Sequence, residues 1–269
     1  TYIYTHNYLI SMFFIELQLV FEEAVLLCMM RLWCDFEFHH LGYLFDISDK
    51  TASRCFHIIL KSLDIMFQHE LFGLNEHSKE SMRVAKPLPC FKKFPHLGLV
   101  LDCTEVFMQH SGQSEVGKLF WSDYKKHHTV KILVGINSAG RVSFVSTCKP
   151  GKISDKHITD VTKVLKYIPE GWTVMVDKGF LIDDLAGVHD IKVVRPPFLP
   201  KNKQFTDQQA NLGADIAQAR IHVERVIQRA KRFRIISHEI LNSTMPYISI
   251  LVKVCFALVN LTGDCVIDK

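Results

Sequence analysis

Three apolar stretches decide the fold of this chain: LGLVLDCTEVFMQ (residues 97–109), KILVGIN (131–137) and RVSFVSTC (141–148). Aliphatic and β-branched residues dominate each stretch, and a short SAG turn at 138–140 separates the second from the third. Short apolar runs bounded by turn residues are typical of β-strands, and tight turns between such runs favour antiparallel pairing. The sequence therefore predicts an antiparallel three-stranded meander.

The region after this meander alternates between helical and strand-like patterns. We expect a helix over residues 155–167, a fourth strand in WTVMVD (172–177), a fifth in IKVVRPP (191–197), and a helix from 207 to 231 followed by a last apolar helix. Antiparallel strands followed by helical crossovers have the order of an RNase H-like domain. We therefore predict an α/β fold, with an RNase H-like mixed sheet flanked by helices.

The residues before the meander indicate a second, all-helical part. Apolar residues recur at helical spacing from Phe21 to Phe67, with no proline and no strand-like alternation. Polar residues and three prolines then mark a linker. The predicted division is a helical domain over residues 1–74, a linker over 75–95 and the RNase H-like domain over 96–269.

A finer pattern in the helical part is compatible with a helix-turn-helix. Residues 41–45 end one short helix, residues 46–48 form a turn, and Ser48 or Asp49 can cap a second helix over 51–66. Such a turn leaves the polar start of the second helix free to meet DNA. An ordinary helical hairpin with capped ends explains the same pattern.

Three acidic residues stand in apolar surroundings: Asp102 within LVLDCT, Asp177 at the end of TVMVD, and Glu224 within RIHVERVIQR. A buried carboxylate needs a cation, hydrogen bonds or solvent as a partner, and divalent metals bind clustered carboxylates from different elements. Taken singly, Asp177 could be only a turn residue, and Glu224 only a helical partner of Arg220. The hypothesis of a metal site depends on the three together.

The segments around these acids closely resemble the DDE superfamily endonuclease domain of eukaryotic transposases, of the type related to the Harbinger group. The resemblance is carried by LDCTEVF, WSDYKKHHTVKILVGINSAGRVSFVS, PGKISDKHIT, VMVDKGF, RPPFLPKNKQFT and RIHVERVIQRAKRFRI, which follow one another between residues 98 and 240. The segment at 26–56 is similar to the helix-turn-helix that often precedes this domain, which favours that interpretation over a hairpin.

The resemblance implies that Asp102, Asp177 and Glu224 form a catalytic acidic triad and bind two divalent ions, Mg or Mn. Asp155 matches a further acidic position with a supporting role. Lys178 stands where the family more often has arginine, which keeps the charge and loses the fork geometry. The implied activity is metal-dependent hydrolysis and transfer of DNA phosphodiesters. The alternative is a domesticated derivative that binds DNA or protein and no longer cuts.

The implied partners are DNA, as transposon ends and target, a second copy of the chain and a separate DNA-binding accessory protein; the implied location is the nucleus. A net charge of +4 does not by itself establish a DNA partner, so the distribution of charge matters. Candidate DNA contacts are the cations and one hydroxyl group near the predicted helix-turn-helix and triad. They are Lys50, Thr51, Arg54, Lys125, Lys126, Arg220 and Arg225.

Composition argues against several other classes of protein. The eight cysteines form no C-x-x-C pair and predict reduced thiols, and the spacing of Cys28, Cys34, His39 and His40 fits no common zinc pattern. The first twenty residues lack the pattern of a signal peptide or anchor, and residues 245–261 predict a buried terminal helix. No nucleophile elbow supports a serine or cysteine hydrolase.

Overall fold

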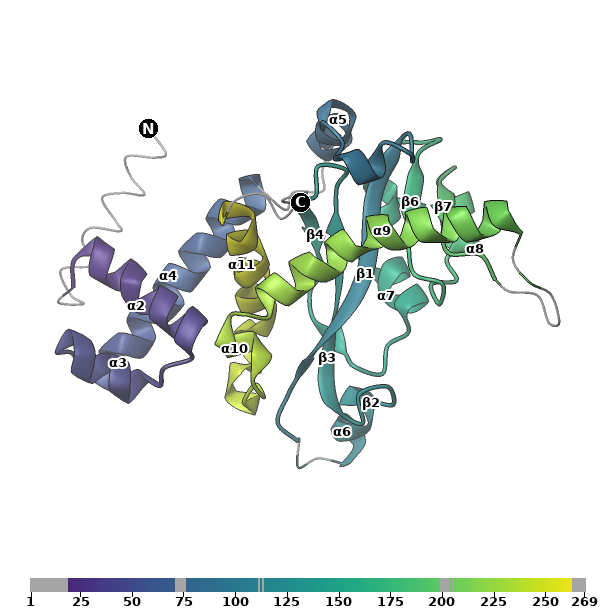
Figure 1. Cartoon of the computed structure of the whole chain (residues 1–269). Coiled ribbons are helices and arrows are strands. Elements are labelled where there is room, and N and C mark those ends of the chain that lie inside the picture. The colour runs from purple at the N-terminus through teal and green to yellow at the C-terminus, as the bar shows by residue number, and fades with distance from the viewer. Residues whose placement is uncertain are drawn as a thin grey trace.

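The computed structural model describes residues 19–70, 76–110, 112, 114–198, 204 and 206–262. A group of helices lies on one side of a mixed sheet, and one long helix, α9, crosses that sheet (Figure 1). The element order confirms the predicted fold class, an α/β sheet flanked by helices and preceded by a helical region.

The helical region contains α2 (Phe21–Cys34), α3 (Phe38–Phe45) and α4 (Asp49–Glu70). The turn between α3 and α4 is tight, because Asp46 adopts φ 52° and the amide of Ile47 donates to the carbonyl of Gly42 at 2.9 Å. A Cβ atom on Gly42 would lie 2.7 Å from the carbonyl oxygen of Ile47, so only glycine permits this approach. This close approach explains why a glycine stands at residue 42 of α3.

Ser48 caps α4, because its Oγ accepts a hydrogen bond from the amide of Thr51 at 3.1 Å. Replacing Ser48 with alanine is expected to lower the free energy of unfolding by about 1 kcal/mol, since an orphan amide at the helix start loses its acceptor. Urea unfolding measures the change. The matched control is Ser62→Ala on the exposed face of the same helix, which should stay within about 0.5 kcal/mol of wild type. Equal effects of the two substitutions would contradict the capping role.

The sheet is built around β1 (Leu97–Phe107), which pairs antiparallel with β3 (His127–Ile136) and parallel with β6 (Thr173–Met175). On one side β4 (Val142–Val145) pairs antiparallel with β3, and on the other β7 (Lys192–Val194) pairs parallel with β6. The predicted antiparallel meander is confirmed, and the strands that follow the predicted crossovers, β6 and β7, pair in parallel.

Three features of the sheet domain differ from the sequence expectation. The helix α6 (Ser114–Phe120) and the short strand β2 (Trp121–Ser122) lie between β1 and β3, and β5 (Lys149–Pro150) adds a second short pairing to β3. The helix expected over 155–167 is divided into α7 (Asp155–Thr162) and the 3-10 helix η2 (Val164–Tyr167). The division occurs at Lys163, whose φ of 53° ends α7.

Alternation along β1 assigns its side chains to two layers. Val100 and Val106 belong to the core cluster that α9 (Asp207–Ala230) and α11 (Ile248–Leu261) cover. Leu99 and Leu101 belong to the other cluster, which contains residues of α7 and of α8 (Asp183–Gly187). Because successive side chains of a strand point to opposite faces, Asp102 lies on the face of α9 and Glu105 on the face of α7.

The helical region and the sheet domain share one hydrophobic core in the described residues. Phe56 of α4 and Phe256 of α11 are members of the same buried cluster, and α4 contacts α11. Trp33 of α2 packs edge-on against Phe233, with ring centroids 5.0 Å apart, close to α10 (Arg234–Ser237). The segment predicted as a linker holds two further elements, α5 (Glu76–Val84) and η1 (Pro89–Phe91).

The residues Asn242–Leu261, which comprise η3 (Asn242–Tyr247) and α11, are long and apolar enough to cross a membrane by length and composition alone. Half of this stretch is buried inside the structure, and α11 contacts α4, α9 and β4. The prediction of a buried terminal helix is confirmed, because its apolar side chains, Leu251 and Val252 among them, contribute to the core.

Candidate active site

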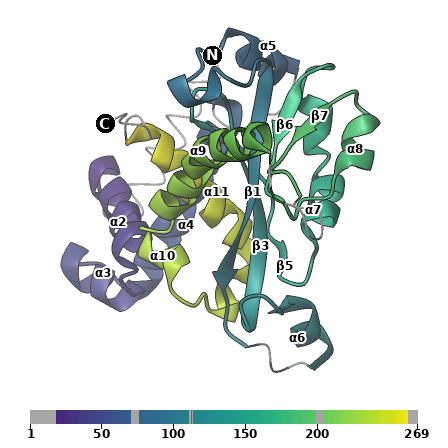
Figure 2. The same ribbon diagram turned by 45° about the vertical axis from the view of Figure 1, so that its right-hand side comes forward.

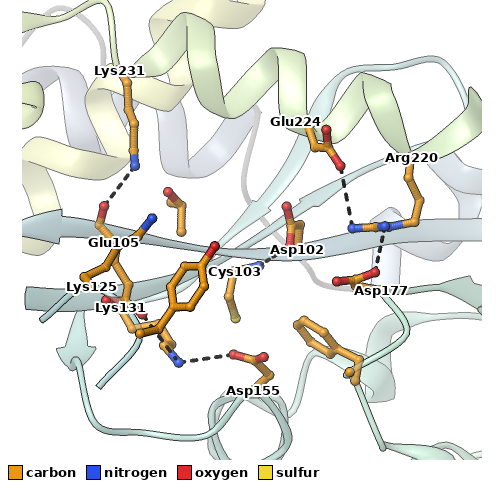
Figure 3. Close-up of a pocket in the computed structure, with 14 residues that line it drawn as sticks. Asp102, Cys103, Glu105, Lys125, Lys131, Asp155, Asp177, Arg220, Glu224 and Lys231 are labelled. Carbon is orange, nitrogen blue, oxygen red and sulfur yellow. Dashed lines mark hydrogen bonds and ion pairs between the residues drawn. The ribbon is translucent and has the colours of Figure 1, made fainter. Parts of the chain in front are cut away.

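A pocket of about 570 Å³ opens beyond the point where the pairing of β6 with β1 ends. The pairing of these two strands ends at Val100, so the edge of β1 beyond this point is uncovered on that side. Asp102 follows on β1, Asp177 follows the end of β6, and Glu224 lies in α9. The three acids predicted as a triad therefore line one pocket, although they come from three separate elements (Figure 3).

Asp102 is the most enclosed of the three acids. Burial raises the pKa of its carboxyl to about 6, and the charges of Glu224 and Asp177 act in the same direction. The Arg220 guanidinium and the backbone amide of Cys103, which donates to Asp102 Oδ1 at 2.9 Å, partly offset this rise in pKa. Burial and the neighbouring acids disfavour the charged form of this carboxylate. A bound cation would favour that form, so Asp102 is a suitable ligand for a cation.

Arg220 contacts the other two acids. Its Nη1 lies 2.8 Å from Asp177 Oδ1, and its Nη2 lies 3.7 Å from Glu224 Oε1. The arginine and Glu224 are one helical turn apart on α9, so the helix itself sets their spacing. Asp177 also accepts a hydrogen bond of 2.7 Å from the amide of Lys178, which fixes its carboxylate at the turn after β6.

A second carboxylate pair lines the same pocket on the α7 side. Lys131 Nζ lies 3.2 Å from Asp155 Oδ1 and 3.8 Å from Glu105 Oε1, and it donates to the carbonyl of Ile153 at 2.8 Å. Glu105 and Lys131 stand directly opposite each other on β1 and β3, which explains their contact. Thr129 adds a hydroxyl donor to Glu105 at 2.8 Å.

Sequence reasoning missed Glu105 and Lys131. The signal that singled out Asp102 applies also to Glu105, which lies in the same apolar stretch, whereas Lys131 stands at the first position of its predicted strand. Their opposite positions follow only from the register of β1 against β3. The acidic position Asp155, expected to have a supporting role, begins α7 and lies in this second pair.

Some of the cations near the triad line the pocket, and others do not. Lys125 and Lys231 line it together with Arg220, and Lys231 Nζ donates to the carbonyl of Glu105 at 2.9 Å. Burial lowers the pKa of Lys231, and the nearby charge of Lys125 lowers it further. The candidate contacts Lys126 and Arg225 are exposed and are not part of the pocket lining.

The remaining candidate DNA contacts lie far from the pocket residues in the sequence, at the start of α4, the second helix of the predicted helix-turn-helix. Lys50 and Arg54 are exposed and Thr51 is half-buried, and all three belong to the first two turns of α4. None of the three lines the pocket. In Figure 1 and Figure 2, α3 and the start of α4 next to it lie to the left of β1, and α7 lies to its right. These residues and the triad therefore belong to two separate surfaces.

The donor set of the pocket fits divalent metal ions, since carboxylate oxygens are the ligands that Mg and Mn prefer. Within the described residues, Glu37, His39 and His40 form a tight group of potential metal ligands. Their ligand atoms all lie within 4.8 Å of one another, and the three side chains are exposed. The three acids do not form so tight a group, and Arg220 lies between two of them.

In the described part of the chain, no cysteine belongs to a group of three close metal-binding side chains. Cys28 is buried, and its pKa is raised to about 12 by burial, which disfavours the thiolate that binds metals. The seven described cysteines form no disulfide with one another, and Cys265 lies outside the described residues.

Comparison with known proteins agrees with this architecture. The model of the DDE superfamily endonuclease family matches residues 101–260, and the model of the helix-turn-helix of DDE superfamily endonucleases matches residues 18–68. A probable transposase for insertion sequence element IS702 from Microchaete diplosiphon is 24% identical over 226 residues, which cover 84% of this chain and 75% of the relative. The chain therefore belongs to the DDE superfamily of endonucleases and carries their helix-turn-helix at its N-terminal side.

Proposed function

We propose that this protein is a metal-dependent DNA endonuclease and transposase that uses Asp102, Asp177 and Glu224 to hold two divalent ions. The observation that carries the proposal is that these acids, from β1, the turn after β6 and α9, line a single pocket. Membership of the DDE superfamily supports it, and so does the similarity to a probable transposase.

Bound Mg or Mn would activate the attacking water and stabilise the leaving oxygen of the phosphodiester. The residues of the chain supply the other requirements. Asp102, Asp177 and Glu224 hold their carboxylates at fixed positions, and Lys125 and Arg220 offer positive charge to the phosphates that the acids would otherwise repel. In the first reaction, water would form a bond to phosphorus while the bond from phosphorus to the 3′ oxygen breaks, which frees a DNA 3′-hydroxyl. In the transfer reaction, such a hydroxyl would form the new bond to a target phosphorus while the target strand's own phosphorus–oxygen bond breaks.

DNA would be held at both surfaces described above. Lys50, Thr51 and Arg54 at the start of α4 are proposed to contact one DNA segment, in the manner of a helix-turn-helix. Lys126 and Arg225 are exposed and follow the pocket residues Lys125 and Glu224 in the chain, and they are proposed to contact the DNA backbone. A DNA substrate of this kind also predicts that the protein acts in the nucleus.

The test is cleavage of supercoiled plasmid by the purified full chain in Mg, in Mn and in EDTA, with Asp177→Ala beside the wild type. Nicked or linear product that requires metal and disappears in the variant is the expected result. Cutting that survives the substitution would overturn the assignment of this site. Absence of cutting with DNA binding retained would favour the alternative, a domesticated protein that binds DNA or protein without cleaving.

A further inference from the structure

Arg220 is held between two of the acids that are proposed to bind metal. Its side chain is 13% exposed, whereas the side chains of Asp177 and Glu224 are 49% and 48% exposed. The two carboxylates thus open toward solvent while the guanidinium lies behind them, and Figure 3 shows it pointing from α9 to both. The arginine therefore occupies carboxylate oxygens that a metal ion would need.

The hydrogen bonding of Arg220 is incomplete in this position. Its Nε atom is buried and has no hydrogen-bond acceptor among the described residues. A guanidinium has donors arranged in a planar fork, and a phosphate group can accept two of them at once. A DNA phosphate entering the pocket would therefore offer Arg220 acceptors that its present neighbours do not supply.

A divalent ion and the guanidinium cannot both be close neighbours of the same carboxylate oxygens without strong repulsion, because both are cations in a partly enclosed site. We propose that Arg220 couples DNA binding to metal loading. Its guanidinium competes with metal for Asp177 and Glu224 until a DNA phosphate draws it away. This inference rests on the proposed function, and linkage requires that metal and DNA each tighten the binding of the other.

The test measures Mn²⁺ affinity by electron paramagnetic resonance of the free ion, with the full chain alone and with a short duplex DNA. Wild type and Arg220→Met are titrated, binding by DNA alone is subtracted, and the duplex is checked on a gel for integrity. Without DNA, the variant is expected to bind Mn²⁺ about tenfold more tightly than wild type, within the usual range of coupling between sites. DNA should tighten Mn²⁺ binding about tenfold in wild type and less than about twofold in the variant.

Two further variants make the test specific. Arg220→Gln removes the charge but keeps a polar side chain, and it should give the same Mn²⁺ affinities as those expected for Arg220→Met. It replaces Arg220→Met in the test if the methionine variant folds poorly. Arg195→Met is the matched control, because Arg195 forms a 2.6 Å ion pair with Asp183, is 22% exposed and is not part of the pocket lining. It should keep wild-type Mn²⁺ affinity and wild-type enhancement by DNA.

The outcomes separate this inference from the function on which it rests. Mn²⁺ binding that is unchanged by loss of Arg220, or that DNA enhances equally in wild type and in the Arg220 variants, overturns the coupling and leaves the metal site intact. No Mn²⁺ binding by wild type or by the Arg220 variants, with or without DNA, overturns both the coupling and the proposed metal site.

Discussion

Replacing Asp102 with asparagine is expected to lower the rate of metal-dependent DNA cleavage by about 10³-fold or more. A bound metal ion contributes several kcal/mol of transition-state stabilisation, and each 1.36 kcal/mol corresponds to about a factor of ten in rate. Asparagine keeps the shape of the side chain and the oxygen that accepts from the Cys103 amide, while it removes the negative charge. Single-turnover cleavage of plasmid DNA in Mg measures the loss.

The same substitution should stabilise the folded protein in EDTA at pH 8. The pKa of Asp102 is raised to about 6 in the folded state from an ordinary value of 3.8. The folded state thus binds more protons between about pH 4 and 6. The free energy of unfolding therefore falls as pH rises through that window, and the penalty persists above it. Asparagine carries no charge, so Asp102→Asn removes this penalty. The free energy of unfolding should rise by about 2 kcal/mol at pH 8 and by less at pH 5.

Urea unfolding of both proteins in EDTA at the two pH values checks this gain. The control is Asp160→Asn, which removes an exposed carboxylate of α7 that pairs with Lys163 at 2.7 Å. It should neither stabilise the protein nor slow cleavage. An Asp102→Asn variant that is less stable than wild type at pH 8, or that still cuts DNA at the wild-type rate, would show that Asp102 is not a strained metal ligand.

Replacing Phe256 with alanine is expected to lower the free energy of unfolding by about 3–5 kcal/mol. The phenyl ring is 1% exposed and lies in α11, the helix that contacts both α4 and α9. Its removal leaves a cavity in the core that the helical region shares with the sheet. Both parts should therefore lose stability together.

Urea unfolding followed by two signals tests this expectation. Far-UV circular dichroism reports on all helices, and tryptophan fluorescence includes Trp33 of α2, which packs against Phe233. The two transitions should coincide and shift equally. Leu261→Ala at the exposed end of the same helix is the control, with an expected change within about 0.5 kcal/mol. A helical region that unfolds separately, with its midpoint unchanged by Phe256→Ala, would contradict the shared core.

The sequence was sufficient to predict the order of the longer elements. Apolar runs with turn residues between them predicted β1, β3, β4, β6 and β7, because strand formation depends on local residue type and spacing. The long helix α9 begins at the predicted residue and ends one residue before the predicted end, because apolar residues at helical spacing mark it along its length. The short elements α6, β2 and β5 were missed, because runs this short leave little periodic signal.

The sequence also singled out the three acids, because a carboxylate inside an apolar run is unusual wherever the run folds. Their roles as metal ligands remain a proposal. Glu105 carries the same local signal as Asp102, and the family resemblance pointed to Asp155. No local pattern indicated that these two acids lie on either side of Lys131. That arrangement depends on the register of β3 against β1 and on the position of α7, which involve residues far apart in the chain.

The sequence alone therefore determined the longer elements and the three unusual acids, because both follow from patterns among near neighbours in the chain. Only the tertiary structure decided that Asp102, Asp177 and Glu224 share one pocket, that Arg220 lies between two of them, and that α11 joins the helical region to the sheet. The physical reason is that these are long-range contacts. They are set by packing of layers and by strand register, which depend on the whole fold.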